Sequence, residues 1–157
     1  MSHKNTIQRF ESGWREWVAL PELKIPSIKV KLDTGARTSS LHTFDLETFE
    51  VRGQLRVKFG VHPIQRSTKA EIFCTADVID TRIVKNSGGH LEERYVIKTP
   101  IIFGEHQWPI EITLSNREDM KFRMLLGREA MRKRVSIIPD KSYLTGRKLA
   151  KHYHLMG

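Results

Sequence analysis

The stretch that decides the fold is Ile28-Lys29-Val30-Lys31-Leu32-Asp33-Thr34-Gly35-Ala36. From Ile28 to Leu32 apolar side chains alternate with lysines, which is the pattern of a strand with one buried face. The strand runs directly into Asp-Thr-Gly and so places the carboxylate of Asp33 on a tight turn. Gly35 allows a sharp bend and a close approach by another chain. An ordinary Asx-type turn uses the same residue types, so the tripeptide alone leaves a catalytic and a structural interpretation open.

The same alternation continues through the middle of the chain. It predicts strands over residues 55–61, 72–78 and 110–114. The polar stretch Asn86-Ser87-Gly88-Gly89 lies between apolar runs, which predicts a hairpin.

Trp14 and Trp17 have helical spacing, but Gly13 before them and Pro21 after them bound a short segment, and we favour a strand. One short helix is expected to begin near Arg128. Many strands with one late helix predict an all-β domain that is closed or nearly closed.

The length of 157 residues fits a single domain over residues 1–157, with a core over about 13–143 and a basic tail over 144–157. Lysine and arginine number 27 against 18 aspartates and glutamates, which gives a net charge of +9. Such an excess favours an acidic partner, although it can also serve solubility alone. The tail is interpreted as a solvated terminus, with a basic arm that contacts an acidic partner as the alternative.

Three features favour the cytoplasm. The single cysteine, Cys74, cannot form an intrachain disulfide, which fits a reducing compartment. No apolar run has the length of a membrane span, and the first residues lead into no apolar segment of the kind a signal peptide needs. We therefore expect a cytoplasmic protein with no membrane partner.

A second element strengthens the catalytic interpretation of Asp33. The segment Met124-Leu125-Leu126-Gly127-Arg128 runs an apolar strand into Gly-Arg and then into the predicted helix. Together with Asp33-Thr34-Gly35-Ala36 it resembles the two signature elements of retropepsins, in the same order along the chain. The resemblance implies an aspartic peptidase with a closed acid-protease barrel.

A fuller set of segments resembles one bacterial family. The segments are Gly13-Trp14-Arg15-Glu16, Leu20-Pro21, Lys31 to His42, Arg94-Tyr95-Val96-Ile97 and Met124 to Arg128. The family is called RimB-like, also carries the name ATP-dependent zinc protease, and resembles the chain from about residue 13 to residue 143. It is linked to the RimK ligase, which adds glutamates to a ribosomal protein of the small subunit. The resemblance implies a peptidase that trims such tails, with an acidic substrate, that ribosomal protein and a RimK-type ligase as partners.

The implied mechanism needs two aspartates, and the chain contains one Asp-Thr-Gly, since Asp80-Thr81 is followed by Arg82. We therefore expect a homodimer whose two-fold axis passes between the two Asp33 side chains. Two carboxylates brought close together share a proton, so one can accept a proton from a bound water while the other donates one to the substrate carbonyl.

The resemblance also assigns roles to residues around the two elements. The catalytic residues are Asp33, Thr34 and Gly35. The substrate-binding residues are Ala36, Arg37, Thr38 and Ser39, with Gly88 and Gly89 of the hairpin. The residues that support the site are Leu126, Gly127 and Arg128. The hairpin over residues 86–94 is expected to act as a mobile flap, with an ordinary surface hairpin as the alternative.

Arg37 is a departure from the viral retropepsins, which carry an acidic residue at this position that pairs with the arginine of Gly-Arg. Arg37 and Arg128 cannot pair with each other, so we expect Arg128 to use another acid. We predict that Arg37 binds acidic substrate side chains through two parallel hydrogen bonds. The alternative is a structural ion pair with Glu16 or Asp119.

The residues do not support the name ATP-dependent zinc protease. The chain has no Gly-x-x-x-x-Gly-Lys-Ser/Thr and no His-Glu-x-x-His, and the nearest ligand pair is His152-x-His154 in the tail. We therefore expect no cofactor and no metal. Ser39 or Ser40 with His42 lacks a nucleophile elbow.

Cys74 falls on the apolar phase of its predicted strand, which favours a core residue over a nucleophile.

A function of another class also fits the charge: a non-enzymatic basic module that binds RNA or the ribosome. It explains the charge of +9 but leaves the pair of motifs unexplained. In either case Arg132-Lys133-Arg134 is interpreted as a solvated helix face, with anion binding as the alternative. The substitution Asp33→Asn separates the two functions, because it abolishes cleavage and spares binding.

Overall fold

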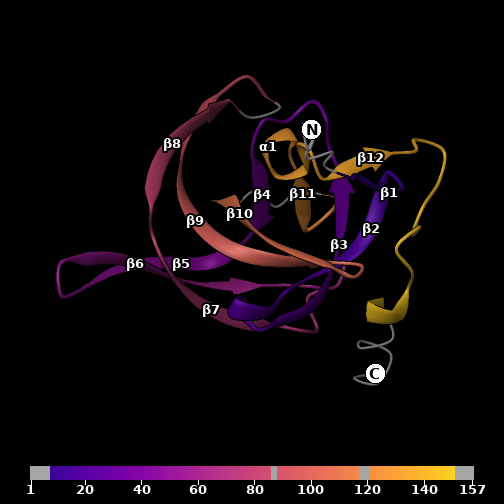
Figure 1. The fold of residues 1–157 in the computed structure, drawn as a ribbon. Helices are drawn as coiled ribbons and strands as arrows, with labels where there is room; N and C mark the ends of the chain where they lie inside the picture. Colours follow the sequence, from indigo (N-terminus) through magenta and orange to yellow (C-terminus); the bar gives the residue numbers. More distant parts are fainter. Residues whose placement is uncertain (1–7, 86–87, 117–120, 151–157) are drawn as a thin grey trace, which may run out of the picture.

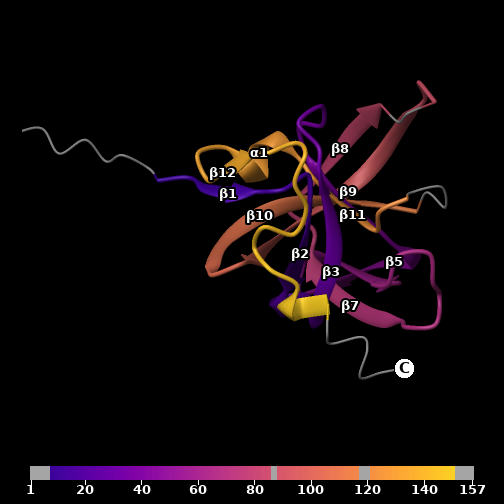
Figure 2. The same ribbon diagram turned by 90° about the vertical axis from the view of Figure 1, so that its right-hand side faces the viewer.

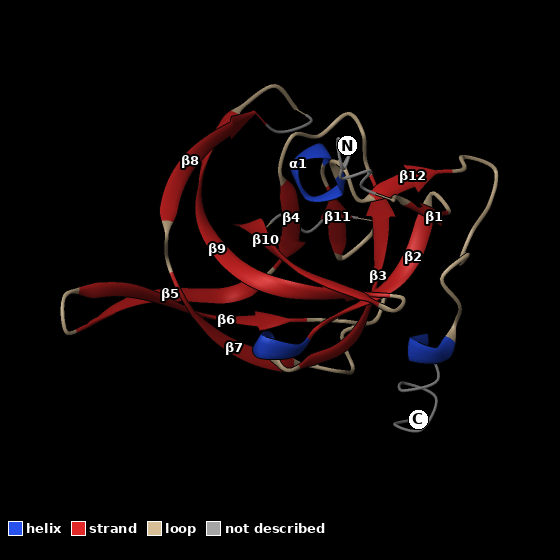
Figure 3. Cartoon of the chain, viewed as in Figure 1, coloured by secondary structure: helices blue, strands red, loops and turns tan. Residues whose placement is uncertain are grey.

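Strands dominate the computed structural model, which describes residues 8–85, 88–116 and 121–150 (Figures 1 and 3). In chain order the strands are β1 (Phe10–Ser12), β2 (Arg15–Leu20), β3 (Ile25–Leu32), β4 (Ser39–His42), β5 (Phe44–Val51), β6 (Gln54–Val61), β7 (Ile72–Asp77), β8 (Asp80–Lys85), β9 (Leu91–Phe103), β10 (His106–Ser115), β11 (Met124–Leu126) and β12 (Val135–Ile137). The helical elements in these residues are α1 (Arg128–Met131) and the 3-10 turns η1 (Pro21–Leu23) and η2 (Lys148–Ala150). The all-β class and the short helix that begins at Arg128 are confirmed.

A ring of strands encloses the core. The largest sheet has the order β10-β4-β11-β3-β2-β9-β8, and β9 also pairs with β10, so the ring closes between these two strands. The long strand β9 makes the closure possible because it changes partner along its length, pairing with β8 up to Val96 and with β10 from Val96 onward. Figure 1 shows β9 curving through the molecule, with β8 on its outer edge.

Strand β11 brings the end of the chain beside its beginning. It inserts between β3 and β4, parallel to β3, with Met124 opposite Val30 and Leu126 opposite Leu32. Both strands therefore end at the same edge of the ring, one in Asp33 and the other in Gly127. The two sequence elements meet here through a pairing between residues about ninety positions apart.

A smaller sheet, β5-β6-β7, completes the core. Val57, Phe59 and Val61 of β6 are fully buried and belong to the same apolar cluster as the ring, and the β5–β6 hairpin projects away from the ring (Figure 1). The predicted strand over residues 55–61 is confirmed as β6. The strand predicted over 72–78 corresponds to β7, which ends at Asp77.

The other strands predicted from the sequence are also present in the structure. The strand predicted over residues 110–114 lies within β10, and the predicted hairpin is formed by β8 and β9. Trp17 lies in β2, which confirms the strand favoured there, while Trp14 directly precedes β2. Strands β1 and β12 pair in parallel and lie beside α1 (Figure 2).

Glu16 attaches the C-terminal segment to β2. Its carboxylate is fully buried and accepts hydrogen bonds from the backbone N–H groups of Gly13, Leu144 and Thr145 and from the Thr145 hydroxyl, at 2.6–3.1 Å. These hydrogen bonds hold the chain against β2 as far as Thr145, whereas the basic tail was expected to begin at residue 144. The rest of that tail from residue 151, with His152 and His154, lies outside the described residues.

Among the described residues, no helix has the length and apolar character needed to cross a membrane.

Candidate active site at the Asp33 turn

Backbone hydrogen bonds hold Asp33 where β3 ends. The Asp33 N–H donates to the carbonyl of Leu126 at 2.8 Å, which continues the pairing of β3 with β11 by one residue. The Asp33 carbonyl accepts the Ala36 N–H at 3.2 Å and closes the turn, while Asp33 Oδ1 accepts the Gly35 N–H at 3.0 Å. One carboxylate oxygen is thus oriented by the turn itself, and the half-buried side chain remains open to the pocket.

Gly127 allows the β11–α1 segment to pack directly on the Asp33 loop. A Cβ at this position would lie 2.6 Å from the Thr38 carbonyl carbon and 2.9 Å from the Arg37 oxygen. Because these neighbours are backbone atoms, only glycine permits this approach. The Gly127 N–H donates to Ser39 Oγ, and the next two amides donate to the carbonyls of Ala36 and Arg37 at 2.8 and 3.0 Å.

The guanidinium of Arg128 closes the outside of the turn. Its Nη1 donates to the carbonyl of Thr34 at 2.9 Å. Arg128 was expected to pair with another acid. Its hydrogen-bond partner is instead this backbone carbonyl. A carbonyl suffices here because the guanidinium is exposed, so water can solvate its charge.

Asp33 lies on a pocket of about 1280 Å³ formed by the turn, β4, the β8–β9 hairpin, β10 and α1. Seven of the lining side chains are basic and three are acidic, which makes the pocket positively charged. The basic ones are Arg37, Arg82, Lys85, Arg94, Lys98, Arg132 and Arg134, and the acidic ones are Asp33, Glu111 and Glu129.

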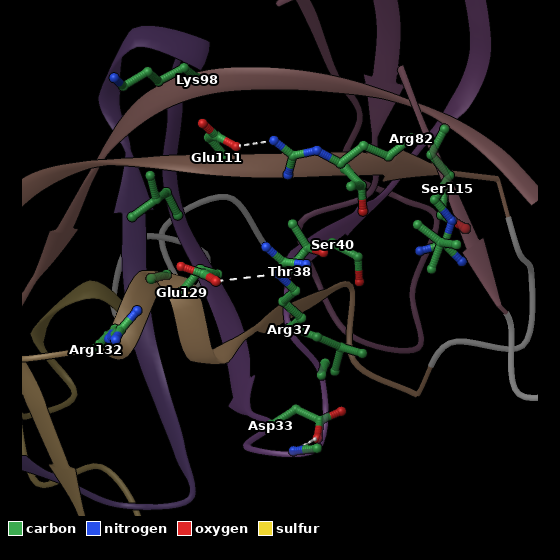
Figure 4. Close-up of a pocket in the computed structure, with 18 of the residues that line it drawn as sticks. Asp33, Arg37, Thr38, Ser40, Arg82, Lys98, Glu111, Ser115, Glu129 and Arg132 are labelled. Carbon is green, nitrogen blue, oxygen red and sulfur yellow. Dashed lines mark hydrogen bonds and ion pairs between the residues drawn. The ribbon is translucent and has the colours of Figure 1, made fainter. Parts of the chain in front are cut away.

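Two of the three carboxylates are neutralised by arginines (Figure 4). Glu111 accepts from Arg82 at 2.5 Å, and Glu129 accepts from Arg37 at 3.3 Å. The hydrogen bond to Glu111 is the main reason that the pKa of Arg82 is raised above its ordinary value, with Asp80 adding to it. Asp33 is the carboxylate of this lining that has no ion pair to a basic side chain of the described residues.

Five of the predicted site residues meet at this pocket, and the others take other positions. Asp33, Gly35, Ala36, Arg37 and Thr38 line it. Thr34 is exposed at the outside of the turn. Ser39 was expected to bind substrate, but it is buried behind the lining, where its hydroxyl fixes Gly127, and Ser40 lines the pocket instead.

The hairpin predicted as a flap borders the same pocket as Asp33, through Ile83, Val84 and Lys85 of β8 and Arg94 of β9. Gly88 and Gly89, predicted to bind substrate, are exposed near its tip and are not part of the lining. Residues 86 and 87 lie outside the described residues. That the hairpin moves as a flap stays a prediction.

Sequence reasoning missed most of the basic lining. Arg82 and Arg94 lie directly opposite each other in the β8–β9 pairing. Both are six residues from Gly88, so a hairpin centred on that glycine would have predicted their proximity. Arg132 and Arg134 follow α1, and their place at the pocket agrees with the anion-binding alternative more than with a purely solvated face.

Cys74 and a possible metal site are the remaining candidates from the sequence. Burial raises the pKa of the Cys74 thiol to about 12, and the thiol donates to the Leu23 carbonyl, so Cys74 is a neutral core residue at neutral pH. The described residues contain no group of three His, Cys, Asp or Glu side chains that could hold a metal ion.

Comparison with known proteins identifies relatives of this chain. The model of the RimB-like family, described as retropepsin-like aspartic endopeptidase RimB, matches residues 12–148. A probable alpha-L-glutamate ligase of Shewanella halifaxensis is 46% identical over 138 residues, or 88% of this chain and 30% of the relative. One of Desulfotalea psychrophila is 50% identical over 127 residues, or 81% of this chain and 27% of the relative. The chain thus spans less than a third of these curated relatives.

A solved structure shares the fold. The crystal structure of Lpg0085, a protein of unknown function from Legionella pneumophila, matches 88% of this chain and 99% of its own with a TM-score of 0.74. The two sequences are 24% identical, so the likeness concerns the fold alone.

Proposed function

The chain belongs to the RimB-like family of retropepsin-like aspartic endopeptidases, and on that basis we propose that it hydrolyses peptide bonds with a water activated by two Asp33 carboxylates of a homodimer. The observation that carries the proposal is the position of Asp33. Backbone hydrogen bonds fix it at the end of β3, it faces a large pocket, and arginines neutralise the other two carboxylates of the lining.

The chemistry is general acid–base catalysis by a carboxylate pair. The ionised Asp33 takes a proton from the bound water, whose oxygen attacks the carbonyl carbon, while the protonated Asp33 donates its proton to the carbonyl oxygen. The tetrahedral intermediate then breaks at the C–N bond as the amine nitrogen receives a proton. The products are one new carboxylate and one new amine, and no other reactant is consumed.

A second copy of the chain is the proposed source of the second carboxylate. Asp-Thr-Gly occurs once in the sequence. Thr34 and Gly35 are exposed at the surface, where a two-fold axis can bring another turn against them. Specific activity should therefore fall on dilution below the dimerisation constant. A fully active monomer at high dilution would contradict the dimer.

The proposed substrate is a glutamate-rich tail, such as the one a RimK-type ligase adds to a ribosomal protein in the cytoplasm. The pocket carries an excess of basic side chains that attracts polyanions. The curated relatives are named glutamate ligases, and this chain matches less than a third of each. A peptidase segment joined to a ligase would act on the product of that ligase. Arg37 faces the same pocket and is proposed to contact substrate carboxylates at its rim.

The test is to incubate the purified protein with a glutamate-tailed peptide and follow the products by mass spectrometry. We expect stepwise loss of glutamate mass from the wild type and intact peptide with Asp33→Asn. The activity should persist in a chelator and without nucleotide. If chelation removes it and zinc restores it, the mechanism proposed here is wrong.

A basic module that binds RNA or the ribosome is the second candidate, favoured by the positive charge of the pocket. Such a module would bind RNA at least as well after the substitution Asp33→Asn as before it, since binding does not use the carboxylate. Cleavage by the wild type that Asp33→Asn abolishes would favour the peptidase, whereas binding without any cleavage would favour the module.

A further inference from the structure

The β8–β9 hairpin places two positive charges against each other at the pocket. Arg82 and Arg94 are direct partners in the register, so their side chains lie on the same face, and both line the pocket. Like charges in directly opposite positions destabilise a sheet. This arrangement therefore needs negative charge nearby.

The guanidinium of Arg82 has more carboxylate partners among the described residues than that of Arg94. Arg82 bonds both Asp80 and Glu111, at 3.0 and 2.5 Å. Arg94 bonds Glu92 through Nη2 at 3.1 Å. Its Nε is buried and has no hydrogen-bond partner among the described residues, and only 9% of the side chain is exposed.

A buried guanidinium N–H without a partner is costly, because the water it would bind has been removed and nothing in the chain replaces it. Arg94 also lines the pocket, so a small shift of its side chain would present this N–H to an acceptor that enters the pocket. The acceptor that bonds a charged N–H donor most strongly is an ionised carboxylate oxygen.

We propose that Arg94 is a specificity-determining residue, which binds a side-chain carboxylate of a glutamate-rich substrate through its free Nε–H. The proposal rests on the proposed function, and it assigns selectivity to Arg94 rather than to Arg37. Arg37 is 78% exposed and already paired with Glu129, so its hydrogen bonds compete with water. Arg94 is shielded from water, so a charged hydrogen bond to it is stronger.

The test measures binding in an Asp33→Asn background, where no substrate is consumed. A labelled oligoglutamate and an oligoglutamine of the same length are titrated by fluorescence anisotropy against this protein with and without Arg94→Gln. We expect Arg94→Gln to weaken oligoglutamate binding about ten-fold or more. Binding of oligoglutamine should be unchanged.

Arg132→Gln is the matched control, because it removes the same charge from an exposed side chain of the same pocket. Its effect should be smaller and should vanish at high salt, where screening removes long-range attraction. Arg94→Lys, which keeps the charge but loses the planar fork, should recover only part of the affinity. It also serves as the second variant if Arg94→Gln unfolds.

Equal losses from Arg94→Gln and Arg132→Gln, or equal losses on both peptides, would overturn the role of Arg94. The outcome is separate from that of the proposed function, because binding does not require hydrolysis. If the wild type cleaves nothing while Arg94 still selects oligoglutamate, the peptidase proposal fails and the inference about Arg94 stands.

Discussion

The Asp33 turn and the β8–β9 hairpin face the same pocket, yet different interactions set their side chains. At the turn, backbone groups of residues 33–37 bond backbone groups of residues 126–129, and these bonds hold the carboxylate, while the one ion pair that the described residues form between the two segments, Arg37–Glu129, is largely exposed. At the hairpin, Arg82 and Arg94 are positioned by carboxylates, one of them from the neighbouring strand β10. A catalytic carboxylate needs accurate placement, which main-chain bonds give, whereas attraction of an acidic substrate needs charge, which side chains give.

The largest expected effect is at the turn. Asp33→Asn keeps the shape of the side chain but removes the group that accepts and donates the proton, so kcat/KM should fall by at least about 10²–10⁴-fold. The measurement is peptide cleavage followed by mass spectrometry. The control is the unfolding temperature, which should change little because the backbone bonds of the turn remain. Residual activity near that of the wild type would remove Asp33 from the mechanism.

The next effect tests whether the main chain holds the carboxylate. Gly127→Ala places a methyl group against the backbone of Arg37 and Thr38, and the forced shift should cost about 1–3 kcal/mol of stability. Because the same segment bonds the Asp33 turn, activity per folded molecule should fall as well.

Gly53→Ala is the control for this substitution. Gly53 lies in the β5–β6 turn with a φ of 80° and no atom within 4 Å of a new Cβ. It should lose about 1–2 kcal/mol through backbone conformation alone and keep full activity per folded molecule. If Gly127→Ala is equally active, the close packing of β11–α1 on the turn does not position Asp33.

The same contrast explains how much could be predicted from the sequence. The turn is encoded by neighbouring residues, since an alternating strand that ends in Asp-Thr-Gly specifies both the element and the exposed carboxylate. The strand β11 could be expected from its apolar run. Its place between β3 and β4 depends on long-range pairing that a single sequence does not display.

The basic lining of the pocket was harder to predict, because its side chains come from β8, from β9 and from the segment after α1. The partner of Arg37 shows the difficulty. Glu16 was one expected acid, yet it points inward from β2 and holds the C-terminal segment, and Asp119, the other, lies outside the described residues. Glu129 is the acid that pairs with Arg37, because α1 packs on the Asp33 loop.

A smaller effect is expected for Arg37 as a substrate contact. Arg37→Gln should lower kcat/KM for a glutamate-rich peptide by about five-fold or less, because the side chain is 78% exposed and water competes for its hydrogen bonds. The loss should shrink in a salt series, and a neutral peptide should show little change. Equal losses on both peptides would show that Arg37 supports the fold or the dimer instead.

The smallest effect concerns the ion pair between Arg37 and Glu129. At 3.3 Å between Arg37 Nε and Glu129 Oε1, with side-chain exposures of 78% and 53%, the pair should contribute less than about 1 kcal/mol to stability. A double-mutant cycle of Arg37→Gln and Glu129→Gln, followed by urea unfolding, measures this coupling directly. Glu129→Gln also removes a negative charge from the pocket and frees Arg37, so it should strengthen binding of oligoglutamate slightly while Arg37→Gln weakens it. A coupling well above about 1 kcal/mol would mean that the turn, like the hairpin, depends on side-chain charges, and the contrast between the two regions would then be lost.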